Sequence, residues 1–231
     1  MDLEKIYHRT ELVLGKQVIK KIKESKVCIC GIGGVGSYVL EALARTGIGE
    51  ITVIDKDDVD ITNVNRQIIA TVDNVGKSKV DEAVKRINSI NPTIHINGIK
   101  EYIDESNIDK LITKDLDYVI DAIDSVDSKI AIIKRCKEIG VKVISCMGTA
   151  NKIDPLKLTV TDIAKTEMCP LAKVVRKKLK EMNITKVKVV YSTEPAIKNN
   201  EGVLGSVSYV PSVAGLLIAS EVIKDISKEL V

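Results

Sequence analysis

The sequence is poor in aromatic residues: its 231 residues include six Tyr but no Phe and no Trp. The core therefore has to be built from Ile, Val and Leu, a composition that suits buried parallel strands. Hydrophobic residues make up 45% of the chain and charged residues 29%, as in an ordinary globular protein. No repeat and no Pro/Gly-rich linker divides the chain, so we expect a single domain over residues 1–231.

A strong charge of either sign is also missing. The 35 Lys and Arg and the 32 Asp and Glu give a formal net charge of +3, so a surface for nucleic acid would have to be a local basic patch. The helix expected over residues 170–182 is one candidate for contacts with nucleic-acid phosphates. A solvated helix face without a ligand explains the same pattern equally well. The basic residues of this helix are Lys173, Arg176, Lys177, Lys178 and Lys180.

The five cysteines form no C-x-x-C pair. We therefore expect no structural zinc, and we expect reduced thiols in a cytoplasmic protein. The N-terminal segment also lacks the charged, apolar and small-residue pattern of a secretory signal. The cysteines are Cys28, Cys30, Cys136, Cys146 and Cys169.

Long apolar runs are rare, and only residues 203–223 approach the length that a bilayer span requires. Polar residues interrupt this run, and Pro211 suits the first turn of a helix. We therefore expect a helix that is buried in the fold or at a subunit interface, with no stable membrane insertion. A membrane anchor is the alternative.

Runs typical of buried strands alternate with runs of helical period. The predicted strands cover residues 26–32, 50–55, 93–99, 116–121, 141–145, 158–162 and 187–191. The predicted helices cover residues 35–46, 74–90 with Asn74 as a cap, 127–139 and 170–182, preceded by a helical segment over residues 3–24 that is interrupted near Gly15. This order predicts an α/β fold with a Rossmann-like, doubly wound and mostly parallel sheet, an N-terminal helical segment and an irregular C-terminal extension.

A glycine-rich turn joins the first predicted strand to the helix over residues 35–46. In such turns the first glycine permits a tight turn, the second lets backbone N–H groups reach phosphate, and the third lets the helix pack closely on the strand. The motif predicts a bound nucleotide but says little about which one, and a connector without a ligand is the alternative. Its glycines are Gly31, Gly33, Gly34 and Gly36.

A cluster of polar residues follows the second strand. Asp55 lies where an acidic residue binds ribose hydroxyls in such folds, although a turn or cap aspartate is the alternative. The guanidinium of Arg66 can hold two phosphate oxygens at once. Lys79 lies in the first turns of the next predicted helix, where a cation opposes the helix dipole, so either an anion lies near it or it is an exposed surface lysine. The other expected nucleotide-binding residues are Asp57, Asn63 and Gln67, with Asn65 beside them.

Two carboxylates end the fourth predicted strand. The carboxyl ends of parallel strands form the ligand crevice, and Mg²⁺ prefers one or two protein carboxylates together with phosphate oxygens. We expect Asp124 to be the metal ligand and Asp121 to orient the loop.

With these motifs the chain resembles the E1-like superfamily of ATP-dependent adenylating enzymes, the ThiF/MoeB/HesA group, and within it the branch that modifies tRNA. The resemblance covers almost the whole chain. It rests on the glycine turn, residues 43–49, 55–67, 75–77 with Lys79, 90–92, 121–126, 153–155 and 165–166.

The resemblance implies a ligase-type enzyme that uses ATP and Mg²⁺ to adenylate a carboxylate. In this branch the substrate is N6-threonylcarbamoyladenosine at position 37 of tRNA, which is dehydrated to its cyclic form. By resemblance, Arg66 would hold phosphates, Lys79 would neutralise charge on the leaving pyrophosphate, and Asp124 would ligate Mg²⁺. The resemblance also implies a homodimer in which Arg9 reaches the partner's ATP site. A cysteine desulfurase is a further partner that remains open.

Rival interpretations remain open. In relatives that activate a ubiquitin-like sulfur-carrier protein, a cysteine in the region of Cys169 can take up an activated group. Here Cys169 precedes Pro170, where family members commonly have Asp, and a packing role is the alternative to a chemical one. The lack of paired C-x-x-C zinc ligands argues against the carrier-activating enzymes. An NAD-dependent oxidoreductase and a nucleotide-binding partner protein without catalysis are two further classes.

Overall fold

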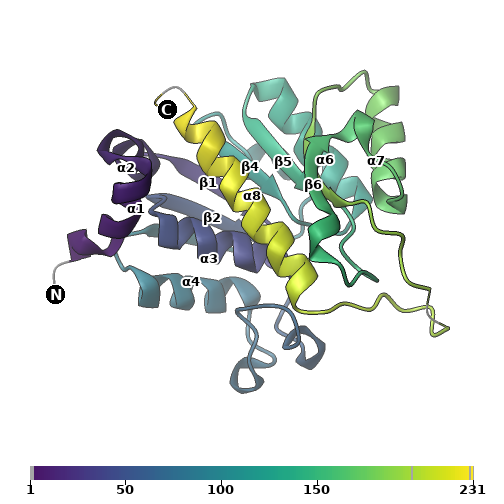
Figure 1. Ribbon diagram of the computed structural model, residues 1–231, viewed down its shortest axis with the longest axis horizontal. Coiled ribbons are helices and arrows are strands. Elements are labelled where there is room, and N and C mark those ends of the chain that lie inside the picture. The colour runs from purple at the N-terminus through teal and green to yellow at the C-terminus, as the bar shows by residue number, and fades with distance from the viewer. Residues whose placement is uncertain (1–2, 199, 229, 231) are drawn as a thin grey trace.

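The computed structural model describes residues 3–198, 200–228 and 230, and its centre is a seven-stranded sheet of order β3-β2-β1-β4-β5-β7-β6 (Figure 1). Neighbouring strands are parallel except for β6 and β7, which are antiparallel. The predicted α/β architecture with a mostly parallel sheet is confirmed. The strands are β1 (Lys26–Cys30), β2 (Glu50–Ile54), β3 (His95–Ile99), β4 (Tyr118–Asp121), β5 (Lys142–Cys146), β6 (Leu158–Asp162) and β7 (Lys188–Ser192).

Helices cover both faces of the sheet. The alternation of side chains along β1 divides the core, because Val27 and Ile29 face the layer of α3, α4 and α8 while Cys28 and Cys30 face α5 and α6. A third cluster joins α6 and α7 to β7. The helices are α1 (His8–Leu14), α2 (Lys16–Lys23), α3 (Gly36–Thr46), α4 (Lys79–Ile90), α5 (Ile108–Leu111), α6 (Val126–Ile139), α7 (Pro170–Glu181) and α8 (Tyr209–Ser227). Short 3₁₀ helices cover Leu3–Tyr7, Ile61–Asn63, Val72–Asn74, Pro155–Lys157 and Ile163–Lys165.

The N-terminal helical segment is interrupted at Gly15, as predicted, where a φ of 86° separates α1 from α2. Tyr7, just before α1, is buried and fixes the N-terminal segment to the layer of α3 and α4. Its hydroxyl donates to the Ala44 carbonyl at 3.0 Å and accepts from Asn91 Nδ2 at 2.8 Å. Burial raises the pKa of Tyr7, so it stays neutral in this position.

The helix predicted over residues 74–90 begins only at Lys79, so the prediction of Asn74 as its cap was wrong. The cap is Ser78, whose hydroxyl accepts from the Asp81 amide at 3.4 Å. Asn74 instead donates from Nδ2 to the Ile69 carbonyl at 2.7 Å and accepts from the Thr71 amide at 2.8 Å. Gly76, with φ of 85°, then turns the chain before the helix starts.

The apolar run at residues 203–223 leads into α8, a helix buried in the fold. The helix begins at Tyr209 with Pro211 in its first turn, as predicted. It packs closely on α3, because a Cβ on Gly215 would lie 2.5 Å from the Val35 carbonyl oxygen. Within the part of the chain that the structure describes, no helix is long and apolar enough to cross a membrane.

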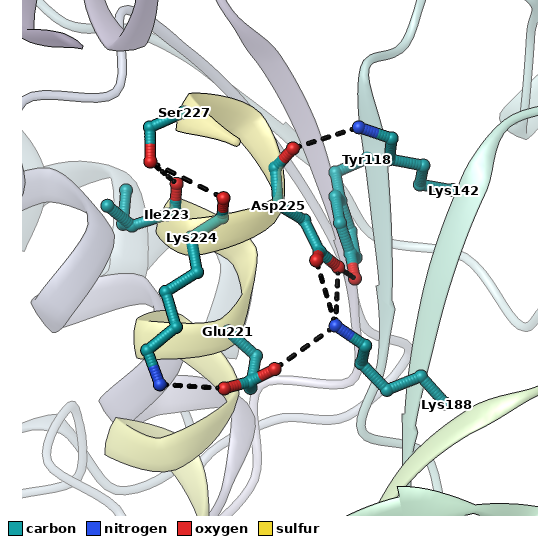
Figure 2. Close-up of polar contacts among 8 residues, drawn as sticks. All are labelled: Tyr118, Lys142, Lys188, Glu221, Ile223, Lys224, Asp225 and Ser227. Atoms are coloured by element: carbon teal, nitrogen blue, oxygen red, sulfur yellow. Dashed lines mark hydrogen bonds and ion pairs between the residues drawn. The ribbon is translucent and has the colours of Figure 1, made fainter. Parts of the chain in front are cut away.

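A polar network fixes the far end of α8 to the first residues of three strands (Figure 2). Lys188 Nζ lies 2.7 Å from Asp225 Oδ2 and 3.1 Å from Glu221 Oε2. The Tyr118 hydroxyl donates to Asp225 Oδ2 at 2.7 Å, and Lys142 Nζ donates to the Asp225 carbonyl at 2.9 Å. The network therefore lies at the amino ends of β4, β5 and β7.

The charged form of Asp225 is stabilised despite partial burial. Burial alone would raise its pKa, but the hydrogen bonds from Lys188 and Tyr118 outweigh burial and lower the pKa. Because the folded-state pKa lies below the unfolded value of about 3.9, this carboxylate contributes stability above that pH. The contribution is lost as the pH falls through the folded-state pKa.

We predict that Asp225→Asn lowers the free energy of unfolding by about 1–3 kcal/mol at pH 7, the range for losing hydrogen bonds to a charged group. The difference from the unmodified protein should shrink as the pH falls below about 4. Urea unfolding at several pH values measures both effects. The exposed Asp73→Asn is the matched control, and a difference that stays constant with pH would contradict the assignment.

Candidate active site

A cavity of about 810 Å³ lies at the carboxyl ends of β1, β2, β4 and β5. Residues from the glycine turn, from the loop after β2 and from the ends of β4 and β5 line it. It is thus at the edge of the sheet opposite to the network around Asp225. Of the expected site residues, the cavity lining includes Gly31, Gly33, Gly34, Asp55, Asp57, Asn63, Arg66, Gln67, Lys79 and Asp124.

The glycine turn needs its glycines for distinct reasons. Gly31 has φ of 89°, and a Cβ there would lie 2.9 Å from the Ala122 carbonyl oxygen. A Cβ on Gly36 would lie 1.8 Å from the Gly31 oxygen, so the start of α3 could not pack as it does. A Cβ on Gly33 would meet only Gln67 Nε2, at 3.9 Å, which leaves this side of the turn open to a ligand.

Asp55 connects the glycine turn with the next loop. Its Oδ2 accepts from the Ile32 amide at 2.6 Å, and its Oδ1 accepts from the Asp57 amide at 2.9 Å. The Asp55 carboxylate therefore stabilises the two turns through backbone amides, and it also lines the cavity. Binding of a ribose by Asp55 stays a prediction.

Arg66 is held by one nitrogen only. Its Nη1 donates to the Thr62 carbonyl at 2.7 Å and to Asn65 Oδ1 at 2.8 Å. Among the described residues, nothing accepts from Nε or Nη2. The guanidinium is thus oriented by the loop while part of its donor set remains available to an anion.

Two buried side chains beside Arg66 differ in how they are satisfied. Asn63 Oδ1 accepts from the Asp60 amide at 3.1 Å and closes the short helix of residues 61–63. Gln67 Oε1 is the one buried side-chain polar atom without a partner in the described part of the chain. Leaving such an atom unpaired costs about 1–3 kcal/mol, a cost that a bound ligand would remove.

Lys79 lies in the cavity wall with only 5% of its surface exposed, so the alternative of an exposed surface lysine was wrong. Its Nζ lies 3.0 Å from Asp57 Oδ2, and its amide donates to the Asp57 carbonyl at 3.1 Å. Asp57 itself is half exposed, at 51% of its side chain. The Lys79 ammonium therefore lies at the first turn of α4 and is paired with Asp57, a carboxylate that is accessible to solvent.

The two carboxylates after β4 have different surroundings. Asp121 is fully buried and binds Lys129 Nζ through both oxygens at 3.1 Å, while it accepts from the Ser145 hydroxyl at 2.5 Å. Lys129 also donates to the Cys146 carbonyl at 2.7 Å. Asp121 Oδ1 accepts from the Ile123 amide at 3.2 Å and so orients the loop, as expected.

Asp124 is exposed at the cavity, and the described residues offer it no hydrogen-bond partner. No group of three or more His, Cys, Asp or Glu residues comes together as a metal cage in the described ranges. A cation bound here would therefore share Asp124 with oxygen atoms of a bound ligand, which is the coordination that Mg²⁺ prefers.

Of two further residues singled out in the sequence, Arg9 lies outside the cavity wall and Cys169 lies within it. Arg9 is exposed on α1 and is not part of the cavity wall of its own chain, so a role in a partner's site stays a prediction. Cys169 is buried in the wall, and its Sγ accepts from the Ala172 amide at 3.5 Å as the cap of α7. This contact supports the packing interpretation. Burial raises the pKa of the neighbouring Cys146 to about 12.

The basic helix is α7, and much of its charge is already engaged. Arg176 donates to the carbonyl and hydroxyl oxygens of Thr166, both at 2.6 Å. Lys178 pairs with Asp127 at 2.6 Å, and Lys177 approaches Glu181 at 3.9 Å. The patch available to nucleic acid is therefore smaller than the sequence indicates.

Sequence reasoning missed several cavity residues. Lys152 follows β5 in a stretch without regular structure, and Tyr102 follows β3 with its hydroxyl 3.3 Å from Ser125 Oγ. Leu204 and Ser206 come from the segment between β7 and α8. The only signal in the sequence was the position of Lys152 and Tyr102 shortly after strands.

The chain is similar to known proteins along almost its whole length. Residues 7–230 match the family described as the ThiF family. A Bacillus subtilis (strain 168) protein named tRNA threonylcarbamoyladenosine dehydratase is 42% identical over 97% of this chain and 95% of its own length. A protein of the same name from Escherichia coli (strain K12) is 40% identical over 85% of this chain and 69% of its own length. The crystal structure of E. coli tRNA N6-threonylcarbamoyladenosine dehydratase in complex with ATP superposes with a TM-score of 0.93 at 36% identity, covering 99% of this chain and 97% of that one.

We predict that Lys129→Met lowers the free energy of unfolding by about 3–5 kcal/mol, because it leaves the buried Asp121 carboxylate without its partner. The double variant Asp121→Leu/Lys129→Met should recover much of the loss. Lys177→Met, which removes an exposed pair, is the control and should change stability by less than about 1 kcal/mol. Urea unfolding measures all three, and a Lys129→Met protein as stable as the unmodified one would refute the prediction.

Proposed function

The chain belongs to the ThiF family, and we propose that it catalyses the ATP-dependent dehydration of N6-threonylcarbamoyladenosine at position 37 of tRNA. The product is the cyclic form of this nucleoside. Relatives of nearly the same length carry the name of this activity. The observation in this chain that supports it best is the set of incompletely satisfied polar groups around the glycine turn.

These groups suit a triphosphate. The open side of Gly33 and the amino end of α3 offer backbone N–H groups to phosphate. Arg66 can donate from Nε and Nη2 to phosphate oxygens. Gln67 Oε1 can accept from a donor such as a ribose hydroxyl or an adenine amino group. The cavity volume, about 810 Å³, is within the usual range of roughly 300–1,000 Å³ for ligand sites.

In the first step, a carboxylate oxygen of the threonyl group forms a bond to the α-phosphorus of ATP. The bond from that phosphorus to the bridging oxygen breaks, and pyrophosphate leaves. Arg66 and Lys79 balance the charge that develops on the leaving group, which is the main contribution that a protein makes to such a transfer. Asp57 holds Lys79 in place at 3.0 Å before the nucleotide arrives.

In the second step, the carbamoyl group of the same nucleoside attacks the activated acyl carbon. The bond between that carbon and the oxygen of AMP breaks, the carbamoyl group loses a proton, and a five-membered ring closes. The oxygen that the carboxylate loses departs on AMP, so the nucleoside loses one water overall. Attack within one nucleoside benefits from the high effective concentration of linked groups.

Mg²⁺ fits this site through Asp124. Its exposed carboxylate faces the cavity without a protein partner among the described residues, and one carboxylate together with phosphate oxygens suits Mg²⁺. When bound, the ion would neutralise phosphate charge.

Four further elements of the proposal extend beyond the nucleotide site. They are a homodimer in which Arg9 completes the partner's site, direct contacts from α7 to tRNA, a cytoplasmic location and an optional cysteine desulfurase partner. Adenylation of a ubiquitin-like sulfur-carrier protein would use the same nucleotide site and is the alternative outcome of the test below.

The test is incubation of the purified protein with ATP, Mg²⁺ and tRNA that carries N6-threonylcarbamoyladenosine. We expect mass spectrometry of the digested tRNA to show the nucleoside minus one water, with AMP released in equal amount. AMP release that depends on a carrier protein, with the nucleoside unchanged, would favour the alternative and refute the proposal.

In the same assay, we predict that Lys79→Met lowers kcat about 10²–10³-fold, the range for losing one electrostatic contact to the transition state. The exposed Lys77→Met on the preceding turn is the matched control and should retain activity. Circular dichroism checks that both variants fold. Equal kcat values for the two variants would remove Lys79 from the mechanism.

A further inference from the structure

Lys152 is a buried cation that the mechanism above does not use. It follows β5, lines the cavity, and exposes only 4% of its surface. Its Nζ donates to the backbone carbonyl of Glu194. No carboxylate forms an ion pair with it within the described residues.

This arrangement leaves the ammonium poorly compensated. An ammonium has three donors, and the described residues supply one neutral acceptor. Burying a charge without a counter-ion is costly, so such a group persists in a fold only when another requirement keeps it.

Glu194 supplies its backbone carbonyl to Lys152, but its side-chain carboxylate binds other groups. The side chain of Glu194 accepts from the amide of Ile153 at 3.1 Å and from the amide of Asp154 at 3.0 Å. The two segments are therefore joined by hydrogen bonds between side chains and backbone rather than by an ion pair. As a result, the positive charge of Lys152 is left for a ligand of the cavity.

The position of Lys152 separates it from the expected phosphate contacts. Gly33 follows β1, while Arg66 and Lys79 lie after β2. Lys152 follows β5, and β4 lies between β5 and β1. Adjacent strands are about 4.8 Å apart, so the chain leaves β5 about 10 Å from the glycine turn. The segment that carries Lys152 thus leaves the sheet on the side of the glycine turn opposite to Arg66 and Lys79, which favours the co-substrate over the phosphate tail of the nucleotide as its ligand.

We propose that Lys152 binds the carboxylate of the threonylcarbamoyl group and positions it for adenylation. This inference rests on the proposed function. A carboxylate that approaches a triphosphate meets like charge, and an adjacent ammonium lowers that repulsion. The contact also distinguishes the modified nucleoside from plain adenosine, because only the former carries an acid.

The test compares Lys152→Met with Lys152→Arg in the cyclisation assay. For Lys152→Met we expect the KM for modified tRNA to rise about 10- to 100-fold, as for one lost hydrogen bond to a charged group, while the KM for ATP is unchanged. Lys152→Arg should recover part of the loss. The matched control is Lys157→Met, which changes an exposed lysine at the end of the short helix that follows Lys152.

Two further measurements separate this role from a structural one. The melting temperature of Lys152→Met should be unchanged or higher, because the substitution removes a buried uncompensated charge. Binding of tRNA with unmodified adenosine should also be unchanged, since a contact to the carboxylate needs the modification.

Three results would overturn the inference. An equal rise in the KM for ATP, together with a lower melting temperature, would indicate a structural residue. Equal loss of affinity for modified and unmodified tRNA would indicate a contact with a backbone phosphate. A Lys152→Met enzyme with unchanged KM would show that the charge is not used. Lack of cyclisation by the unmodified protein would instead refute the proposed function itself.

Discussion

The ion pair between Asp121 and Lys129 is the interaction on which the site depends. Both side chains are completely buried, and the pair joins the end of β4, the first turn of α6 and the end of β5. Such a pair is tolerable only if its remaining polar atoms are satisfied, and here Ser145 and the Cys146 carbonyl do this. Two walls of the active site leave the sheet at this point, since Asp124 follows β4 and Lys152 follows β5. The pair thus fixes the positions from which Asp124, the proposed metal ligand, and Lys152, the proposed substrate ligand, extend into the cavity.

Cations in the cavity are placed so that each retains some capacity for an anion. Lys79 has a half-exposed carboxylate as partner, Arg66 is held through one nitrogen, and Lys152 has a single carbonyl. A protein selected for stability alone would pair or remove these charges. Their joint presence around one cavity follows if two anionic substrates, a triphosphate and a carboxylic acid, have to be brought together there.

The parts of the fold that depend on neighbouring residues could be predicted from the sequence, and those that depend on distant contacts could not. The strand period and the glycine turn are local signals, and they located Gly31 and Gly36 correctly because each works through backbone sterics. Asn74 was misread as a helix cap because its backbone partners, Ile69 and Thr71, precede it in a turn. Lys152 was missed because its acceptor, Glu194, is 42 residues away on another segment. The residues argue against a carrier protein only through the lack of C-x-x-C pairs, and the case for tRNA comes from the names of the relatives.

The C-terminal helix shows how one element can serve both stability and the site. α8 has 19 residues, so it spans about 28 Å, from the cavity to the amino ends of the strands. At one end Asp225 is bound by Lys188, and at the other a Cβ on Gly34 would lie 3.3 Å from Pro211 Cβ. Hydropathy alone left this segment open between a membrane anchor and a buried helix. Since a side chain at position 34 would meet Pro211 in the first turn of α8, the helix also forms the outer side of the glycine turn. The apolar character of α8 is therefore a requirement of the active site as well as of the core.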